Sequence, residues 1–271
     1  MRLLIKLKNK IYPIYRFFLK LFIRSHEKTY VDAQGRRVRY LALRRRGSDR
    51  MVVVFSGFPM AHQMPVYNYL LLLVGQSDYN ALFILDDFIS KPGGGSFYLG
   101  SGGDYYAPEL IGQIIEQYRN KWNICTLVTA GGSKGGTCAL MQGIPLAADY
   151  IIAGACQYYI GSYMKAGSNS YEDLVGKTGS VEELDRLMPE LLKTYANSPK
   201  KPQILLHYSD REHTYREHIV DLREALQHYG YPIALEDVAD YSGHAAVGEY
   251  FPPFFMKMLR AIRDDSFPKA I

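Results

Sequence analysis

The sequence has few cysteines and no uncharged stretch long enough to cross a bilayer. Its 271 residues include only Cys125, Cys138 and Cys156, an odd number without metal-ligand spacing. A chain of this size does not depend on disulfides, so we expect free thiols in a reducing compartment and no metal site. No uncharged apolar run approaches the ~18 residues of a transmembrane helix. Internal repeats and low-complexity tracts are also absent, which leaves one large globular domain or two small ones.

Basic residues concentrate at one end of the chain. Residues 1–50 hold 15 Lys and Arg against 3 Asp and Glu, whereas the remainder holds 17 against 24. The net charge of +5 therefore conceals a mildly acidic body. Because the basic excess is local, it does not indicate a nucleic-acid-binding protein.

The basic segment 1–25 also contains many Leu, Ile, Phe and Tyr residues. Its apolar runs are too short for a signal-peptide core, and no small-residue cleavage site follows. Two interpretations remain: an amphipathic helix on an anionic membrane face, or a helix packed on the body with its lysines solvated. We expect a cytoplasmic protein, and on the first interpretation one that is peripheral on the inner membrane face.

Short apolar runs alternate with longer amphipathic ones along the body of the chain. This alternation predicts an α/β fold with a mainly parallel sheet and helices on both faces. Residues 29–43 predict an antiparallel hairpin with its turn at Gln34-Gly35. The predicted strands are 38–43, 51–56, 81–85, 124–129, 150–155, 203–208 and 234–238, and the predicted helices are 66–73, 108–118, 136–142, 214–228 and 245–263.

Residues 161–201 interrupt this rhythm because they contain no strand signal. Ser180 and Glu183 have the spacing of a capping box, which predicts a helix through about residue 193. An insertion between two strands predicts a helical cap over one end of the sheet; the alternative is a peripheral excursion without function. We therefore divide the chain into an amphipathic N-terminal segment, 1–28, and an α/β domain, 29–271.

A glycine-rich turn lies in TLVTAGGSKGGTCAL, residues 126–140. A phosphate-binding loop would need a hydroxyl residue directly after the lysine, but Lys134 is followed by Gly135. The glycine spacing does not match a dinucleotide-binding turn either. We therefore expect no nucleotide cofactor at this turn.

The same turn fits the pattern G-x-S-x-G, with an apolar strand before it and a helix after it. This context predicts a nucleophile elbow that presents Ser133. Glycines two residues before and after the serine, Gly131 and Gly135, remove side chains that would clash in the tight crossing. The side chain of Lys134 either favours an anionic substrate or is solvated.

A nucleophilic serine needs a base and an acid that orients the base. His244 lies in a loop between the last strand and the last helix, and the chain order serine then histidine fits; the alternative is a turn histidine that caps the helix. Asp210 and Glu212 follow the penultimate strand, and either could reach His244. Glu212 is slightly favoured because it lies nearer the start of the next helix. Among the other histidines, His62 could line the site, whereas those of the 214–228 helix region are interpreted as surface or packing residues: His213, His218 and His228.

Two backbone N–H groups are expected to hold the oxyanion. One belongs to Lys134 and the other to Gly57 or Phe58, in the loop after an early strand. Asp86 and Asp87 are interpreted as turn acids or substrate contacts. Aromatic residues in the glycine-rich stretch 91–106, Phe97 among them, could stack on a sugar or acyl group; the alternative is a long surface loop.

Four short segments, GGSKG at 131–135, FSGFP at 55–59, SDREH at 209–213 and SGH at 242–244, resemble the α/β-hydrolase superfamily in type and order. More narrowly, GGSKGGT and the later ADYIIAGACQYYIGSY are similar to α/β-hydrolase-like proteins of bacterial capsular polysaccharide biosynthesis and to glycan O-acetyltransferases of the accessory secretion pathway. The resemblance implies acyl transfer or ester hydrolysis on a cell-surface glycan or its precursor. Tyr208 departs from the glycine that hydrolases often carry before the acid, which leaves the position of the acid open.

The first hypothesis is thus a serine esterase or acyltransferase that acts on a small-molecule or glycan acyl substrate without metal or cofactor. The alternative hypothesis is a catalytically inactive binding or scaffold subunit of a membrane-associated glycan assembly. The sequence indicates no oligomeric state.

Overall fold

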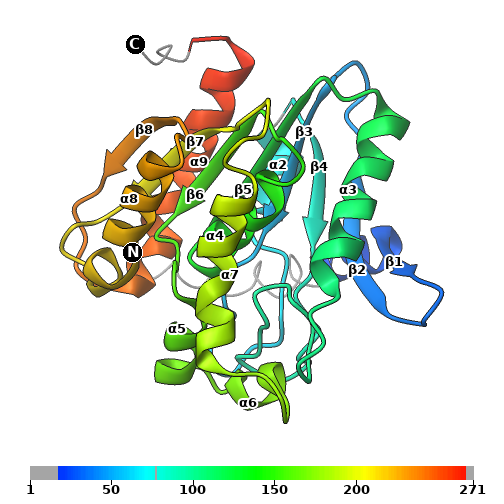
Figure 1. Ribbon diagram of the computed structural model, residues 1–271. Helices are drawn as coiled ribbons and strands as arrows, with labels where there is room; N and C mark the ends of the chain where they lie inside the picture. Colours follow the sequence, from blue (N-terminus) through cyan, green and yellow to red (C-terminus); the bar gives the residue numbers. More distant parts are fainter. Residues whose placement is uncertain (1–17, 77, 267–271) are drawn as a thin grey trace, which may run out of the picture.

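An eight-stranded sheet runs through the computed structural model, which describes residues 18–76 and 78–266. The strand order is β1-β2-β4-β3-β5-β6-β7-β8 (Figure 1). β3 to β8 are mutually parallel, whereas β1 and β2 run antiparallel to their neighbours. The predicted mainly parallel sheet and early hairpin are confirmed. The strands are β1 Glu27–Val31, β2 Arg37–Leu43, β3 Arg50–Phe55, β4 Asn80–Ile84, β5 Thr126–Gly132, β6 Tyr150–Gly154, β7 Gln203–Tyr208 and β8 Ile233–Val238.

Helices cover both faces of the sheet. In Figure 1, α3, α4, α7 and α8 lie in front of it, whereas α2 and α9 lie behind. A π-helical turn, η1, leads into α8, and a 3-10 turn, η2, leads into α9. The bounds are α2 Leu70–Gln76, α3 Ala107–Trp122, α4 Lys134–Gly143, α5 Ile160–Gly167, α6 Tyr171–Val175, α7 Val181–Thr194, η1 Tyr215–Ile219, α8 Val220–His228, η2 His244–Ala246 and α9 Val247–Arg263.

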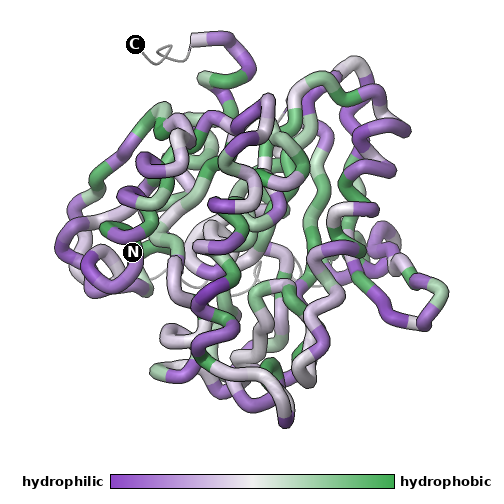
Figure 2. The backbone as a smooth tube through the Cα atoms, in the orientation of Figure 1, coloured by the Kyte–Doolittle hydropathy of each residue, from purple (hydrophilic) through white to green (hydrophobic). Residues whose placement is uncertain are grey.

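Successive side chains of the central strands enter two different cores. In β3, Met51, Val53 and Phe55 pack with the helices in front, whereas Val52 and Val54 pack with those behind. Side chains alternate along a strand, so a continuous apolar run marks a strand that is buried on both faces. Figure 2 shows the result: the central strands are hydrophobic, while the flanking helices carry both classes of residue.

The insertion between β6 and β7 forms α5, α6 and α7. Ser180 accepts a hydrogen bond from the Glu183 N–H at 3.1 Å, as the capping box predicts. α7 returns along the front face and packs there through Leu184, Met188 and Leu192, whereas α5 and α6 lie beyond the carboxyl ends of the strands (Figure 1). The role of this segment as a cap stays a prediction.

Two predicted elements differ in their bounds from the observed ones. β5 was expected at 124–129 but runs from Thr126 to Gly132, because Gly131 and Gly132 pair with β6 before the chain turns. The helix expected at 66–73 begins only at Leu70. The reason is Tyr69, whose φ of 61° is incompatible with a right-handed helix.

The described part of the N-terminal region is helical at residues 18–26. Leu19, Phe22 and Ile23 pack against the rear core, while Leu21 is exposed. Residues 1–17 lie outside the described residues, so the amphipathic segment 1–28 and the membrane contact of residues 1–25 stay predictions. Along the part of the chain that the structure describes, no helix has the length and apolarity to span a bilayer.

Candidate active site

Ser133 lies at a sharp turn between β5 and α4. Its backbone dihedrals, φ 56° and ψ −131°, are strained for a residue with a side chain. A Cβ on Gly131 would come within 2.4 Å of the Gly135 carbonyl, and one on Gly135 within 2.2 Å of the Phe55 carbonyl oxygen. Only glycine fits at both positions, and the strand–turn–helix has the geometry of a nucleophile elbow.

A chain of hydrogen bonds joins Ser133 to a buried acid. His244 Nε2 lies 2.6 Å from Ser133 Oγ, and His244 Nδ1 lies 2.5 Å from Glu212 Oε1. The Thr214 hydroxyl donates to the same Glu212 oxygen at 2.8 Å. We call Ser133, His244 and Glu212 the relay. Its members come from three loops at the carboxyl edge of the sheet, where open α/β folds place their ligands.

The structure brings Glu212, and not Asp210, to the histidine. Asp210 is exposed, and within residues 18–76 and 78–266 no hydrogen bond joins it to His244. The buried Ser209 holds the two loops together, because its hydroxyl donates to the Tyr241 carbonyl at 2.5 Å and accepts from the Arg211 N–H at 3.2 Å. Glu212, three residues after Ser209, is buried.

The expected oxyanion donors gather around Ser133. Lys134 is the first residue of α4, so its N–H has no acceptor within the helix. The loop after β3 passes close by: a Cβ on Gly57 would lie 3.3 Å from the Gly132 carbonyl oxygen and 3.9 Å from Ser133 Cβ. Phe58 follows directly in this loop. The oxyanion role of Lys134, Gly57 and Phe58 stays a prediction.

The side chain of Lys134 is buried and paired. Its Nζ lies 2.5 Å from Asp86 Oδ2, and each side chain is only 1% exposed. The rings of Phe58 and Tyr98 flank the ammonium at 4.9 Å. Both interpretations of Lys134, an attractor for an anionic substrate and a solvated side chain, are therefore wrong. Asp86 is its partner, and it also accepts hydrogen bonds from the N–H and hydroxyl of Ser96.

The glycine-rich stretch 91–106 is packed into the molecule. Residues 94–100 are all buried, and the Tyr98 hydroxyl accepts a hydrogen bond from the Ser56 N–H at 2.6 Å. The prediction of a long surface loop is wrong here. Phe97 is 1% exposed and contacts Phe58, so it cannot stack on a ligand as suggested. Asp87 pairs with Arg39 and is thus a structural acid.

Tyr163, on α5, is a residue that the sequence analysis missed. Its hydroxyl lies near that of Ser133, and its ring centroid lies 6.2 Å from that of His244. Burial raises the pKa of Tyr163, and the nearby Ser133 hydroxyl offsets part of this rise. The phenol is therefore neutral near pH 7. No sequence signal reveals it, because α5 meets the elbow only in the folded chain.

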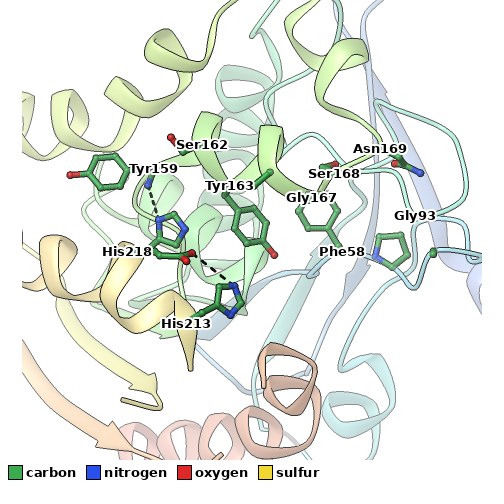
Figure 3. Close-up of a pocket in the computed structure, with 14 residues that line it drawn as sticks. Phe58, Gly93, Tyr159, Ser162, Tyr163, Gly167, Ser168, Asn169, His213 and His218 are labelled. Carbon is green, nitrogen blue, oxygen red and sulfur yellow. Dashed lines mark hydrogen bonds and ion pairs between the residues drawn. The ribbon is translucent and has the colours of Figure 1, made fainter. Parts of the chain in front are cut away.

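A cavity of about 910 Å³ opens beside the relay. Phe58, Tyr163, His213 and His218 are among the residues that line it (Figure 3). The ring of His213 lies 6.0 Å from that of His244. The surface and packing positions predicted for these histidines are confirmed, since His213 is exposed and His218 is buried, and both also line the cavity. His62 is exposed and does not line it.

Solved structures with similar folds support the architecture. The chain matches the Glycosylation Associate Protein (Gap123) complex of Streptococcus agalactiae with a TM-score of 0.69 and 19% identity, over 89% of this chain and 47% of that one. It therefore spans about half the length of that protein. It matches the capsule O-acetyltransferase of Neisseria meningitidis serogroup A with a TM-score of 0.66 and 20% identity, over 84% and 96% of the two chains. FphF, a fluorophosphonate-binding serine hydrolase of Staphylococcus aureus, matches with a TM-score of 0.60 and 13% identity, over 86% and 96%.

No protein-family model and no curated protein sequence matches this chain. At the identities found among solved structures, the likeness shows the fold alone. The chain has the α/β-hydrolase fold, as the resemblance of its motifs implies.

Proposed function

We propose that this protein is a serine esterase or acyltransferase that works through an acyl-enzyme on Ser133. The observation that carries the proposal is the relay: Ser133 Oγ, His244 and Glu212 are linked by contacts of 2.6 and 2.5 Å. In this arrangement the histidine removes the serine proton, and the carboxylate holds its tautomer and stabilises the imidazolium.

The reaction would proceed in two halves. Ser133 Oγ attacks an ester or thioester carbonyl carbon while its proton passes to His244 Nε2, and the oxyanion accepts hydrogen bonds from the Lys134 N–H and the Phe58 or Gly57 N–H. The tetrahedral intermediate expels its alcohol or thiol, which takes the proton from His244. Water or a sugar hydroxyl then gives its proton to His244, attacks the acyl-enzyme and releases Ser133.

We further propose a cell-surface glycan or its precursor as the acyl acceptor or ester substrate. The support is the similarity to the capsule O-acetyltransferase, which has also been solved in complex with CoA. An acyl-CoA is accordingly a suitable acyl donor. The phenol of Tyr163, on the cavity wall near His244, would contact the acyl group or the entering hydroxyl.

Labelling with a fluorophosphonate tests the proposal directly. We expect the probe to modify Ser133 in the folded wild-type protein and His244→Ala to abolish the labelling, because the serine then loses its base. His228→Ala, at an exposed position on α8, serves as the matched control and should label normally. Absence of labelling in folded wild-type protein would refute the proposed enzymatic activity.

The second candidate is a catalytically inactive subunit of a membrane-associated glycan assembly. It is favoured by the similarity to Gap123, which was solved as a complex. The assembled relay supports the enzyme instead, since a scaffold has no need for a base that contacts a serine. Absence of labelling in a correctly folded protein would support the scaffold.

A further inference from the structure

The cavity beside the relay has aromatic walls and several polar groups. It lies between the loop after β3, α5 and η1, with the rings of Phe58, Tyr159 and Tyr163 on its surface (Figure 3). Its volume of about 910 Å³ falls in the range of sites for small organic ligands. The rings of Tyr163 and His213, which line the cavity, lie 6.2 and 6.0 Å from that of His244, so a group in this cavity is close to the relay.

The charge of the cavity excludes some ligands. Its lining contains no Lys or Arg among the described residues, and Glu217 contributes a carboxylate. The lysines on neighbouring segments have other partners, since Lys91 pairs with Asp173 and Lys165 with Glu172. A phosphate or carboxylate in the cavity would thus lack the cationic partner that such groups require when they leave water.

His218 is a polar residue of this cavity whose ring is held by a hydrogen bond from the backbone. Its side chain is buried, and the rings of Tyr159 and Tyr163 lie 6.1 and 5.8 Å from it. The Tyr159 N–H donates to His218 Nδ1 at 3.3 Å (Figure 3). A neutral imidazole that accepts at Nδ1 must carry its proton at Nε2, so Nε2 is a donor.

Burial keeps this ring neutral. Desolvation lowers the pKa of His218, and the neighbouring His213 and His244 lower it further, whereas Glu217 and Asp185 act in the opposite direction. At neutral pH the ring therefore offers one N–H donor without a charge. Such a donor suits a hydroxyl or ether oxygen.

The backbone around His218 is unusual. Residues 215–219 form a π-helical turn, a conformation that is rare and often found at functional sites. The turn follows Glu212 by only three residues, so the acid of the relay and His218 are positioned by the same short segment. The cavity and the relay are thus parts of one structural unit.

We propose that His218 Nε2 donates a hydrogen bond to an uncharged, hydroxylated ring of the substrate, such as a neutral sugar, bound in this cavity between the tyrosines. This inference rests on the proposed function and specifies the alcohol side of the transferred ester. The aromatic rings would contact the apolar face of the sugar, while His218 selects an oxygen.

Two substitutions separate the nitrogens of His218. His218→Asn keeps an oxygen near Nδ1 that can accept from the Tyr159 N–H but removes the Nε2 donor. His218→Gln places an N–H donor near the position of Nε2. The probes are 6-O-acetylglucose as a neutral sugar ester, O-acetylglucuronic acid as an anionic one, and 4-nitrophenyl acetate, which has no sugar.

We expect His218→Asn to raise the KM for 6-O-acetylglucose about three- to tenfold, as for one lost hydrogen bond, and to change the KM for 4-nitrophenyl acetate less, because that ester has no sugar hydroxyl. His218→Gln should restore part of the affinity, and the wild type should prefer the neutral sugar ester to the anionic one.

An unchanged KM in His218→Asn, an equal loss on both neutral esters, or a preference for the anionic ester would overturn the inference. Turnover of 4-nitrophenyl acetate without turnover of the sugar ester would reject the sugar while leaving the serine enzyme intact. Failure of every ester, together with absent fluorophosphonate labelling, would reject the proposed function and this inference with it.

Discussion

Two acids that lie close together in the sequence differ in their burial. Glu212 and Asp210 stand two residues apart after β7, yet the Glu212 side chain is 1% exposed and contacts His244, while Asp210 faces solvent. The sequence reduces the choice to this pair because the triad acid follows a strand. It could not decide between them, because the contact that distinguishes the two acids joins Glu212 to His244, 32 residues further along the chain.

At this scale, the prediction is that Glu212→Gln lowers kcat for 4-nitrophenyl acetate by about 10³- to 10⁴-fold, because the amide no longer stabilises the charged histidine. Asp210→Asn is the matched control and should change kcat less than about twofold, as for a surface position. A larger loss in Asp210→Asn than in Glu212→Gln would show that the relay seen here is not the working one.

Among the elements, the Lys134–Asp86 pair joins the start of α4 to the segment after β4, and Asp86 in turn accepts hydrogen bonds from Ser96 in the stretch 91–106. Sequence reasoning missed this contact for a physical reason. Glycines and a lysine next to a serine suggest a mobile or solvated surface. Only the fold shows that residues 94–100 are buried and that the Phe97 carbonyl accepts from the thiol of Cys138 on α4. Regular elements were easier to predict, because a buried strand or an amphipathic helix leaves its period in the chain.

For this pair, we predict that replacing one of the two charged residues lowers the free energy of unfolding more than replacing both. Asp86→Leu or Lys134→Met alone leaves one buried charge without a partner and should lower the free energy of unfolding by about 3–5 kcal/mol. The double variant should recover a large part of that loss in urea denaturation. Losses that simply add in the double variant would contradict this account of the pair.

At the scale of the whole molecule, buried histidines tie stability to pH. His207 is 2% exposed, lies 2.7 Å from Asp237 through Nδ1 and stacks on Phe254 at 5.0 Å. Burial lowers the pKa of His207, against the opposing effect of Asp237, and desolvation lowers that of His218 likewise. Below a pH of about 6.5 the unfolded chain then binds more protons than the folded one.

The stability that these neutral histidines contribute is therefore present above about pH 6.5 and is lost as pH falls below it. We expect the free energy of unfolding to decrease between pH 7 and pH 5.5 in urea titrations, and His207→Gln to show a smaller decrease. His228→Gln, an exposed control, should behave as the wild type does. An identical decrease in His207→Gln would rule out His207 as a source of the effect.

The sequence by itself determined the α/β sheet, the elbow serine and the order in which serine, acid and histidine follow one another. These features depend on local periodicity and on the glycines two residues before and after Ser133, so residues close together in the sequence are enough to reveal them. Only the tertiary structure shows that Glu212 is the acid in contact with His244, that Lys134 pairs with Asp86, and that Tyr163 and His218 line the same cavity. Such contacts join residues far apart in the chain, and no local pattern encodes which buried partner each polar side chain finds.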